Sequence, residues 1–217
     1  MKEVYIKISN VNKVIKNNTV LDNINLELEK GKIYGFRGKN GSGKTMLFRA
    51  ICGLINFEGD IIISGKKIGK DISFPNSIGI LIEYPGFLPE LTGFKNLKYL
   101  AEIKKNISDD KINRSMEKMG LDPNDRRKYK KYSLGMKQRL GIIQAIMEDP
   151  DLLILDEPTN ALDSDGIMEL NQLLIELKNK GKTILISNHD REELELISDE
   201  VFTISKGKIV TRIGIGD

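Results

Sequence analysis

The stretch GKNGSGKT at residues 38–45 decides the fold. It fits the pattern G-x-x-x-x-G-K-[ST], in which glycines let backbone N–H groups curl around phosphate oxygens. A short apolar run precedes it at residues 33–36, and a helical pattern follows at residues 45–52. A strand, a glycine loop and a helix start in this order make an anion site, because the helix N-terminus carries unpaired N–H groups. The stretch therefore predicts a phosphate-binding loop in an α/β fold.

Two side chains of this loop carry the expected chemistry. Lys44 should reach the β- and γ-phosphates of a nucleotide, and the Thr45 hydroxyl should bind Mg²⁺. A glycine-rich turn with no ligand is the alternative, but a chance match in a chain this long is on the order of one in a hundred. The nucleotide contacts predicted in this loop are Gly38, Asn40, Gly41, Ser42, Gly43, Lys44, Thr45 and Met46.

A second motif, LLILDE at residues 152–157, is an apolar strand that ends in two acids. Open α/β sheets bind ligands at the carboxyl ends of their strands, so both carboxylates are expected at the site. Asp156 would hold the metal, and Glu157 would act as general base or orient the attacking water. His189, the only histidine, follows another apolar strand at residues 183–187, a place that favours contact with the γ-phosphate.

Length and composition exclude several classes of protein. The 217 residues suit one to two domains at the usual ~150 residues each, and 40% hydrophobic residues exclude disorder as the dominant state. A net charge of +3 is too small for an overall nucleic-acid footprint. Cys52, the single cysteine, excludes a disulfide framework and is expected to be a small buried hydrophobe. No apolar stretch reaches the ~18 residues of a membrane span, and none forms a signal segment.

Hydrophobic patterning along the chain predicts an α/β fold with a mostly parallel core sheet and helices on both faces. A small antiparallel β subdomain is expected at the N-terminus and an inserted α-helical subdomain in the middle. We expect one domain over residues 1–217, with the α/β core at 1–90 and 148–217 and the helical subdomain at about 91–147. Strands are predicted at residues 4–8, 21–29, 33–36, 60–64, 78–82, 152–155, 183–187, 201–204 and 208–213. Helices are predicted at residues 45–52, 91–100, 110–119, 165–180 and 191–198, with Ser108 as a possible N-cap.

Taken together, these motifs resemble the ATP-binding subunit of an ABC transporter, over nearly the whole chain. The sequence YSLGMKQR at residues 132–139 is similar to the family's signature motif, and DEPTNALD at 156–163 to its Walker B motif and following loop. His189 matches the family's switch histidine. The resemblance implies a P-loop NTPase that hydrolyses ATP with Mg²⁺, at the cytoplasmic face of the cell membrane. It also implies a separate integral-membrane permease as partner, contacted by the helical insertion.

The resemblance further implies a homodimer that forms on ATP binding. Two copies would pack head to tail, so that Ser133 and Gly135 of one copy bind the γ-phosphate held by the other. Glu83 stands where the family usually has a glutamine; a carboxylate there can still ligate Mg²⁺ but adds negative charge. Ile15 stands where an adenine-stacking aromatic residue is expected, so base selectivity is expected to be loose. The residues around Glu83, with the signature motif, look like the bacitracin- and lantibiotic-resistance branch of exporters.

Other functions stay open at this point. The basic cluster RRKYKK at residues 126–131 is a candidate surface for acidic lipids or nucleic acid, although a solvated loop is the more common role of such a charge run. The first alternative is a soluble ABC-type ATPase that acts on nucleic acid or ribosomes without a membrane partner. The second is a regulatory module that binds nucleotide without hydrolysis. We expect the transport subunit, exporting a peptide antibiotic, a drug or a similar amphipathic compound, with no nucleic acid bound.

Overall fold

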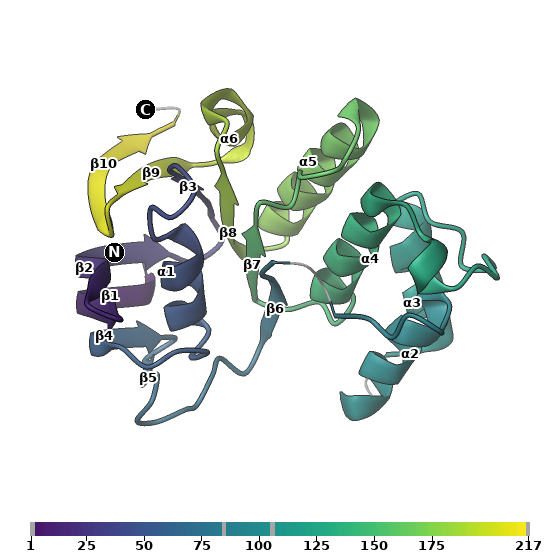
Figure 1. The fold of residues 1–217 in the computed structure, drawn as a ribbon, viewed down its shortest axis with the longest axis horizontal. Helices are drawn as coiled ribbons and strands as arrows, with labels where there is room; N and C mark the ends of the chain where they lie inside the picture. Colours follow the sequence, from purple (N-terminus) through teal and green to yellow (C-terminus); the bar gives the residue numbers. More distant parts are fainter. Residues whose placement is uncertain (1–2, 84–85, 105–106, 216–217) are drawn as a thin grey trace.

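The computed structural model describes residues 3–83, 86–104 and 107–215 (Figure 1). Within these residues the main sheet has six strands in the order β10-β9-β3-β8-β7-β6. All neighbours are parallel except β10, which runs antiparallel to β9, so the predicted mostly parallel sheet is confirmed. The strands are β3 (Ile33–Arg37), β6 (Ile78–Leu81), β7 (Leu152–Asp156), β8 (Thr183–Asn188), β9 (Glu200–Ser205) and β10 (Lys208–Gly214).

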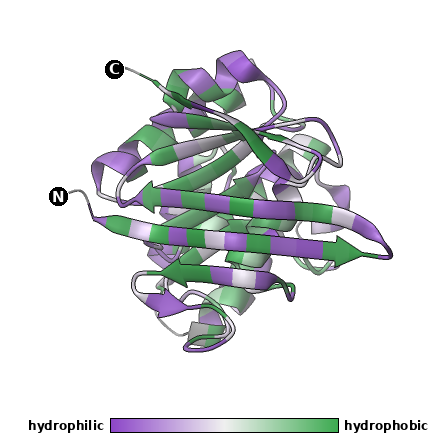
Figure 2. Ribbon diagram, turned by 90° about the vertical axis from the view of Figure 1, so that its left-hand side faces the viewer, coloured by the Kyte–Doolittle hydropathy of each residue, from purple (hydrophilic) through white to green (hydrophobic). Residues whose placement is uncertain are grey.

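The N-terminal part of the chain forms a smaller antiparallel sheet, with its strands in the order β2-β1-β4-β5. Its long strands alternate hydrophobic and hydrophilic residues, as Figure 2 shows, because one face packs on the core and the other meets solvent. Strand β1 is much longer than predicted, whereas β2 begins at Asn18, slightly before the predicted start at Leu21. Asparagines at positions 10, 12, 23 and 25 interrupt the alternation, but they hydrogen-bond across the pair and keep it intact. The strands are β1 (Val4–Ile15), β2 (Asn18–Glu29), β4 (Glu58–Ile63) and β5 (Lys66–Lys67).

Helices lie on both faces of the main sheet, as predicted. Alternate residues of each central strand point to opposite faces, so Tyr34 and Phe36 of β3 join one core and Ile33 joins the other. Helix α1 (Lys44–Ile51) and the antiparallel sheet complete the first core. The second core is completed by α4 (Leu134–Ile146), α5 (Ser164–Asn179) and α6 (Arg191–Ile197).

The chain between β6 and β7 is helical, in agreement with the sequence. It contains α2 (Gly93–Lys104), α3 (Asp109–Lys118), the 3₁₀ helix η1 (Tyr129–Lys131) and then α4. The side chain of Ser108 accepts a hydrogen bond from the backbone N–H of Lys111 and so caps α3 as predicted. Met116 and Met119 are fully buried core residues.

The basic cluster at residues 126–131 differs from a fully solvated loop. Lys128 and Lys130 both bind the Glu90 carboxylate, at 2.8 and 2.6 Å, and these two contacts lower the pKa of Glu90 to about 2. Tyr129 turns inward and is buried against Phe87 and Tyr132. The five basic residues around Tyr129 did not indicate from the sequence that this side chain is buried. Much of the cluster's charge is therefore paired within the chain.

Two further expectations concern burial and membrane spans. Cys52 is buried, and burial raises the pKa of its thiol to about 12, as expected of a structural cysteine. Across the described ranges, no helix has both the length and the apolar composition that crossing a bilayer requires.

The glycine that follows Cys52 ends α1: Gly53 has a φ of 73°, and a Cβ there would lie 2.1 Å from the Ser73 carbonyl oxygen.

Candidate nucleotide site

The carboxyl ends of three parallel strands meet at one edge of the main sheet. Arg37 at the end of β3 lies beside Asn188 at the end of β8, and Asp156 at the end of β7 lies beside Ser187. The glycine loop at residues 38–43 leaves β3 at this edge and leads into α1. The sheet topology therefore brings the three sequence motifs together, as the general rule for α/β sheets predicts.

The glycine loop has a backbone that only glycine adopts without strain. Gly43 has a φ of 115°, and a Cβ there would lie 2.8 Å from the Val20 carbonyl oxygen. Gly43 also begins α1 without any side-chain cap, which leaves the first N–H groups of the helix open to a ligand. In addition, the Ser42 hydroxyl is buried and finds no hydrogen-bond partner within the described part of the chain. Open N–H groups and an orphaned hydroxyl fit a phosphate group in this loop.

Lys44 places a buried cation beside this loop. Its side chain is 4% exposed, and its ammonium donates a hydrogen bond to the Gly38 carbonyl oxygen at 2.7 Å. The same Nζ lies 3.3 Å from a carboxylate oxygen of Glu157. A charge buried in this way strengthens electrostatic contact with an anion, because little water screens it.

Asp156 is held between two hydroxyl groups. Thr45 Oγ1 donates to one carboxylate oxygen and Ser187 Oγ to the other, each at 2.5 Å. Hydroxyl and carboxylate oxygens are the ligands that Mg²⁺ prefers, and Mg²⁺ usually takes its remaining ligands from water and substrate phosphates. The residues present therefore fit this ion. Ser187 was not predicted as a site residue; its position at the end of an apolar strand, two residues before His189, is the signal that could have indicated it.

Glu157 occupies a strained backbone position. Its φ of 49° lies in the left-handed region, which costs a non-glycine residue about 1–2 kcal/mol. Ser187 Oγ accepts a hydrogen bond from its N–H at 2.9 Å, and Gln138 Nε2 donates to the next carbonyl, that of Pro158, at 3.0 Å. Asn160 Nδ2 donates a hydrogen bond to the Glu157 carboxylate at 2.9 Å. The segment that follows β7 is thus fixed by side chains from β8 and α4.

The charge state of Glu157 follows from these neighbours. Partial burial raises the pKa of the carboxyl, but the hydrogen bond from Asn160 and the nearby Lys44 ammonium outweigh it, with a smaller contribution from His189. The net pKa lies below its usual value, so the group is an anion at neutral pH. A fixed carboxylate of this kind can accept a hydrogen bond from a water molecule and orient it.

These residues surround a cavity of about 710 Å³, a size typical of small-molecule sites. Predicted residues on its wall include Ile15, Glu83, Asp156 and Glu157, with every predicted nucleotide contact of the glycine loop and the start of α1 except Gly38. The described residues that line it are Ile15, Lys16, Asn18, Val20, Asn40, Gly41, Ser42, Gly43, Lys44, Thr45, Met46, Glu83, Gln138, Asp156, Glu157 and Asn160.

Four predicted site residues lie off this wall. Gly38 acts through its carbonyl, which binds Lys44, and a Cβ there would lie 2.4 Å from Ser42 Oγ. Ser133 and Gly135 are at the start of α4, where the Ser133 side chain accepts a hydrogen bond from the Met136 N–H. His189 is exposed and affects the cavity through its electrostatic contact with Glu157. Within one copy of the chain, none of these four residues lines the 710 Å³ cavity.

Glu83 lines the cavity but does not join the Thr45–Asp156 group. Its carboxylate binds the Arg49 guanidinium at 2.8 Å, and its side chain is 61% exposed. Like Glu157, it has a positive φ, of 61°.

Comparison with known proteins shows the family to which the chain belongs. A sequence profile of ABC transporters matches residues 21–160, which include the glycine loop and the LLILDE motif. The chain belongs to the ABC transporter family. Its similarity to curated members extends well beyond the matched segment.

Three curated relatives cover nearly all of the chain. An uncharacterized ABC transporter ATP-binding protein, YybJ of Bacillus subtilis, is 48% identical over 207 residues, or 95% of each chain. The bacitracin transport ATP-binding protein BcrA of Enterococcus faecalis is 39% identical, over 99% of this chain and 71% of its own. The lantibiotic transport ATP-binding protein SrtF of Streptococcus pyogenes is also 39% identical, over 94% and 89%. This ABC protein is an ATP-binding subunit and an ATPase.

Solved structures share the fold. The ATP-binding cassette MJ0796, in a dimeric post-hydrolysis state with ADP and Pi, has a TM-score of 0.88 at 23% identity and covers 98% of this chain and 99% of its own. The protein cbiO1 of Clostridium perfringens, part of the ABC transporter complex cbiONQ, has a TM-score of 0.80 at 26% identity, over 98% and 89%. The predicted P-loop NTPase fold is therefore confirmed.

Proposed function

We propose that this ABC ATPase uses ATP and Mg²⁺ to drive a separate integral-membrane permease that exports a peptide antibiotic or a similar amphipathic compound. The observation that carries the ATP-driven part is the Lys44, Asp156 and Glu157 constellation on the wall of one cavity. The names of BcrA and SrtF support the exported class. The working place of the subunit would be the cytoplasmic face of the cell membrane.

Each site residue has a proposed role. The N–H groups at the start of α1 and the Lys44 ammonium bind the phosphates. Thr45 and Asp156 would hold Mg²⁺, with Glu83 as a further ligand; the ion supplies charge neutralisation when bound. Glu157 orients the attacking water, and His189 contacts the γ-phosphate. Ile15 forms a flat apolar contact with the base.

The proposed functional unit is a homodimer formed on ATP binding. The start of α4 is open to a partner: Ser133 is exposed, and Leu134, the next residue, is 54% exposed. A helix N-terminus attracts anions, so Ser133 and Gly135 can bind the γ-phosphate held by a second copy. The absence of these two residues from the cavity wall of one copy agrees with such a shared site.

The dimer is tested by light scattering of the Glu157→Gln variant with ATP. This variant keeps the binding residues but loses the carboxylate that orients water, so it should trap the ATP-bound dimer. The double variant Glu157→Gln with Lys44→Ala is the matched control and should stay monomeric. Monomers of Glu157→Gln at high protein and ATP concentrations would contradict the proposal.

Export is tested in a bacitracin-sensitive bacterial host. The chain is co-expressed with a multispanning membrane protein encoded beside its gene, and growth is measured against bacitracin and against a lantibiotic. We expect resistance with the wild-type chain and none with Glu157→Gln. Equal sensitivity of both strains, with the chain recovered in the ribosome fraction and not with membranes, would favour the alternative of an ATPase without a membrane partner.

A further inference from the structure

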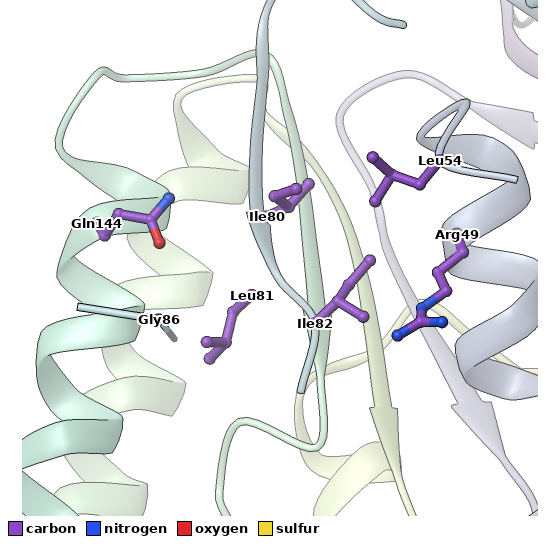
Figure 3. Close-up of a pocket in the computed structure, with 7 residues that line it drawn as sticks. All are labelled: Arg49, Leu54, Ile80, Leu81, Ile82, Gly86 and Gln144. Carbon is purple, nitrogen blue, oxygen red and sulfur yellow. The ribbon is translucent and has the colours of Figure 1, made fainter. Parts of the chain in front are cut away.

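Arg49 connects the nucleotide cavity with a second cavity beside it. Its guanidinium binds Glu83, which lines the nucleotide cavity, at 2.8 Å. Arg49 itself lines a neighbouring cavity of about 350 Å³, together with Leu54 and the β6 segment. Figure 3 shows its side chain extending from α1 beside Ile82, the residue before Glu83. The Arg49–Glu83 ion pair therefore lies between the two cavities.

On α1, Arg49 lies one turn from the residues proposed to bind phosphate and Mg²⁺. Arg49 is four residues after Thr45, so the two side chains lie on the same face of the helix, one turn apart. Apolar side chains line the second cavity together with Arg49, among them Leu54, Ile80 and Ile82 (Figure 3). Arg49 is only 31% exposed, so the pair is screened less than one in open solvent.

The charge balance of the nucleotide cavity explains why such a cation is needed. Among the described residues, the carboxylates of Glu83, Asp156 and Glu157 line this cavity, and a nucleotide brings further negative charge. Lys44 already contacts Glu157, and two hydroxyl groups bind Asp156. The Glu83 carboxylate forms its ion pair with the Arg49 guanidinium. Without that cation, its charge would act unopposed on the phosphates.

We propose that Arg49 is a positioning residue for the nucleotide site. It neutralises Glu83 and holds its carboxylate on the α1 side of the cavity, so that the carboxylate turns toward a metal-bound nucleotide only when this ion pair opens. The inference rests on the proposed ATP and Mg²⁺ site and adds the reason why a carboxylate at position 83 is compatible with it. A glutamine at this position would not need Arg49.

A double-mutant cycle tests this dependence. The dissociation constant of a fluorescent ATP analogue is measured with Mg²⁺ and with EDTA for wild type, Arg49→Gln, Glu83→Gln and the double variant. In EDTA, Arg49→Gln should bind about threefold to fivefold more weakly than wild type, the effect of one partly exposed ion pair. Mg²⁺ should restore most of this loss, because the freed carboxylate can then approach the ion. In the Glu83→Gln background, Arg49→Gln should change neither value.

The controls separate this inference from the proposed function. Arg212→Gln removes another ion pair, with Glu200 at 2.6 Å, and should change no binding constant. Thermal melting of each variant reports whether the fold is kept. An equal loss from Arg49→Gln with Glu83 and with Gln at position 83 would overturn the inference, and so would no loss at all. Failure of the wild-type chain to bind the analogue would instead overturn the proposed function itself.

Discussion

The two ends of the nucleotide cavity are built differently. At the phosphate end, hydrogen bonds and ion pairs connect residues of α1, β7 and β8: Lys44, Thr45, Asp156, Glu157 and Ser187 form one connected group. At the other end, the turn between β1 and β2 supplies the wall, with a half-exposed apolar side chain, that of Ile15. One end is fixed by directional contacts and the other by a flat apolar surface.

This difference predicts a hierarchy of mutational effects. Directional contacts to charged groups are worth more than apolar contact with one face of a base, and their loss leaves a buried charge unpaired. Substitutions at the phosphate end should therefore affect hydrolysis strongly and those at the base end only weakly. Three substitutions, in falling order of effect, test this comparison.

The largest effect is expected from Lys44→Ala. The substitution removes the buried cation that we propose binds the phosphates, and loss of one preorganised charged donor lowers a catalysed rate by about a hundredfold to a thousandfold. The measurement is phosphate release from Mg-ATP by the purified chain. Lys39→Ala is the matched control, because Lys39 belongs to the same loop but is exposed and absent from the cavity wall. Similar rates for both variants would show that the phosphate end does not depend on Lys44.

An intermediate effect is expected from Ser187→Ala. The substitution removes a donor to the Asp156 carboxylate and an acceptor for the Glu157 N–H. A hydrogen bond to a charged group contributes about 1.5–3 kcal/mol, so we expect the Mg²⁺ concentration for half-maximal hydrolysis to rise about tenfold.

Ser198→Ala is the control for this change. Ser198 is equally a buried serine, but its hydroxyl has no hydrogen-bond partner among the residues described, so its loss should leave the Mg²⁺ dependence unchanged. An equal shift in both serine variants would mean that packing, and not the contact with Asp156, causes the effect.

The phosphate end could be predicted from the sequence and most of its supports could not. Lys44, Thr45, Asp156 and Glu157 belong to contiguous motifs whose spacing is set by local backbone geometry. The roles of Ser187 and Gln138 depend on strand and helix neighbours that are far away in the sequence, since Ser187 meets Asp156 only through the register of β7 and β8. Glu83 was predicted as a metal ligand, but no local pattern indicated its pairing with Arg49.

The fold, too, could be predicted from the sequence in some parts and not in others. Apolar runs of strand length and the helical patterns predicted the order of elements, because both patterns depend only on residues that are close together in the sequence. The long β1–β2 pair was underestimated, since its cross-strand asparagine contacts become visible only when the strands are paired. Tyr129 was expected in a solvated loop, because the surrounding lysines and arginines dominate the local pattern.

The smallest effect is expected from Ile15→Tyr, at the base end. Ile15 is 39% exposed and lies at the turn where it pairs with Asn18. An aliphatic side chain offers a base no stacking face and no directional contact, so the wild type should bind ATP and GTP with similar affinity. Stacking on an aromatic ring is worth about 1–3 kcal/mol per base, so the tyrosine should tighten ATP by at least about fivefold. GTP should tighten as well, and CTP less, because a pyrimidine offers the ring a smaller surface.

Competition between a fluorescent ATP analogue and each unlabelled nucleotide measures these affinities. The neighbouring substitution Val14→Tyr is the control, since Val14 is 56% exposed but does not line the cavity, and it should change none of them. Strong preference of the wild type for ATP over GTP would contradict the flat apolar contact and require a directional group near the base. A fall in hydrolysis rate with Ile15→Tyr as large as that with Lys44→Ala would erase the difference between the two ends. Unchanged hydrolysis at saturating ATP, with tighter binding, would instead assign the base end to affinity and the phosphate end to chemistry.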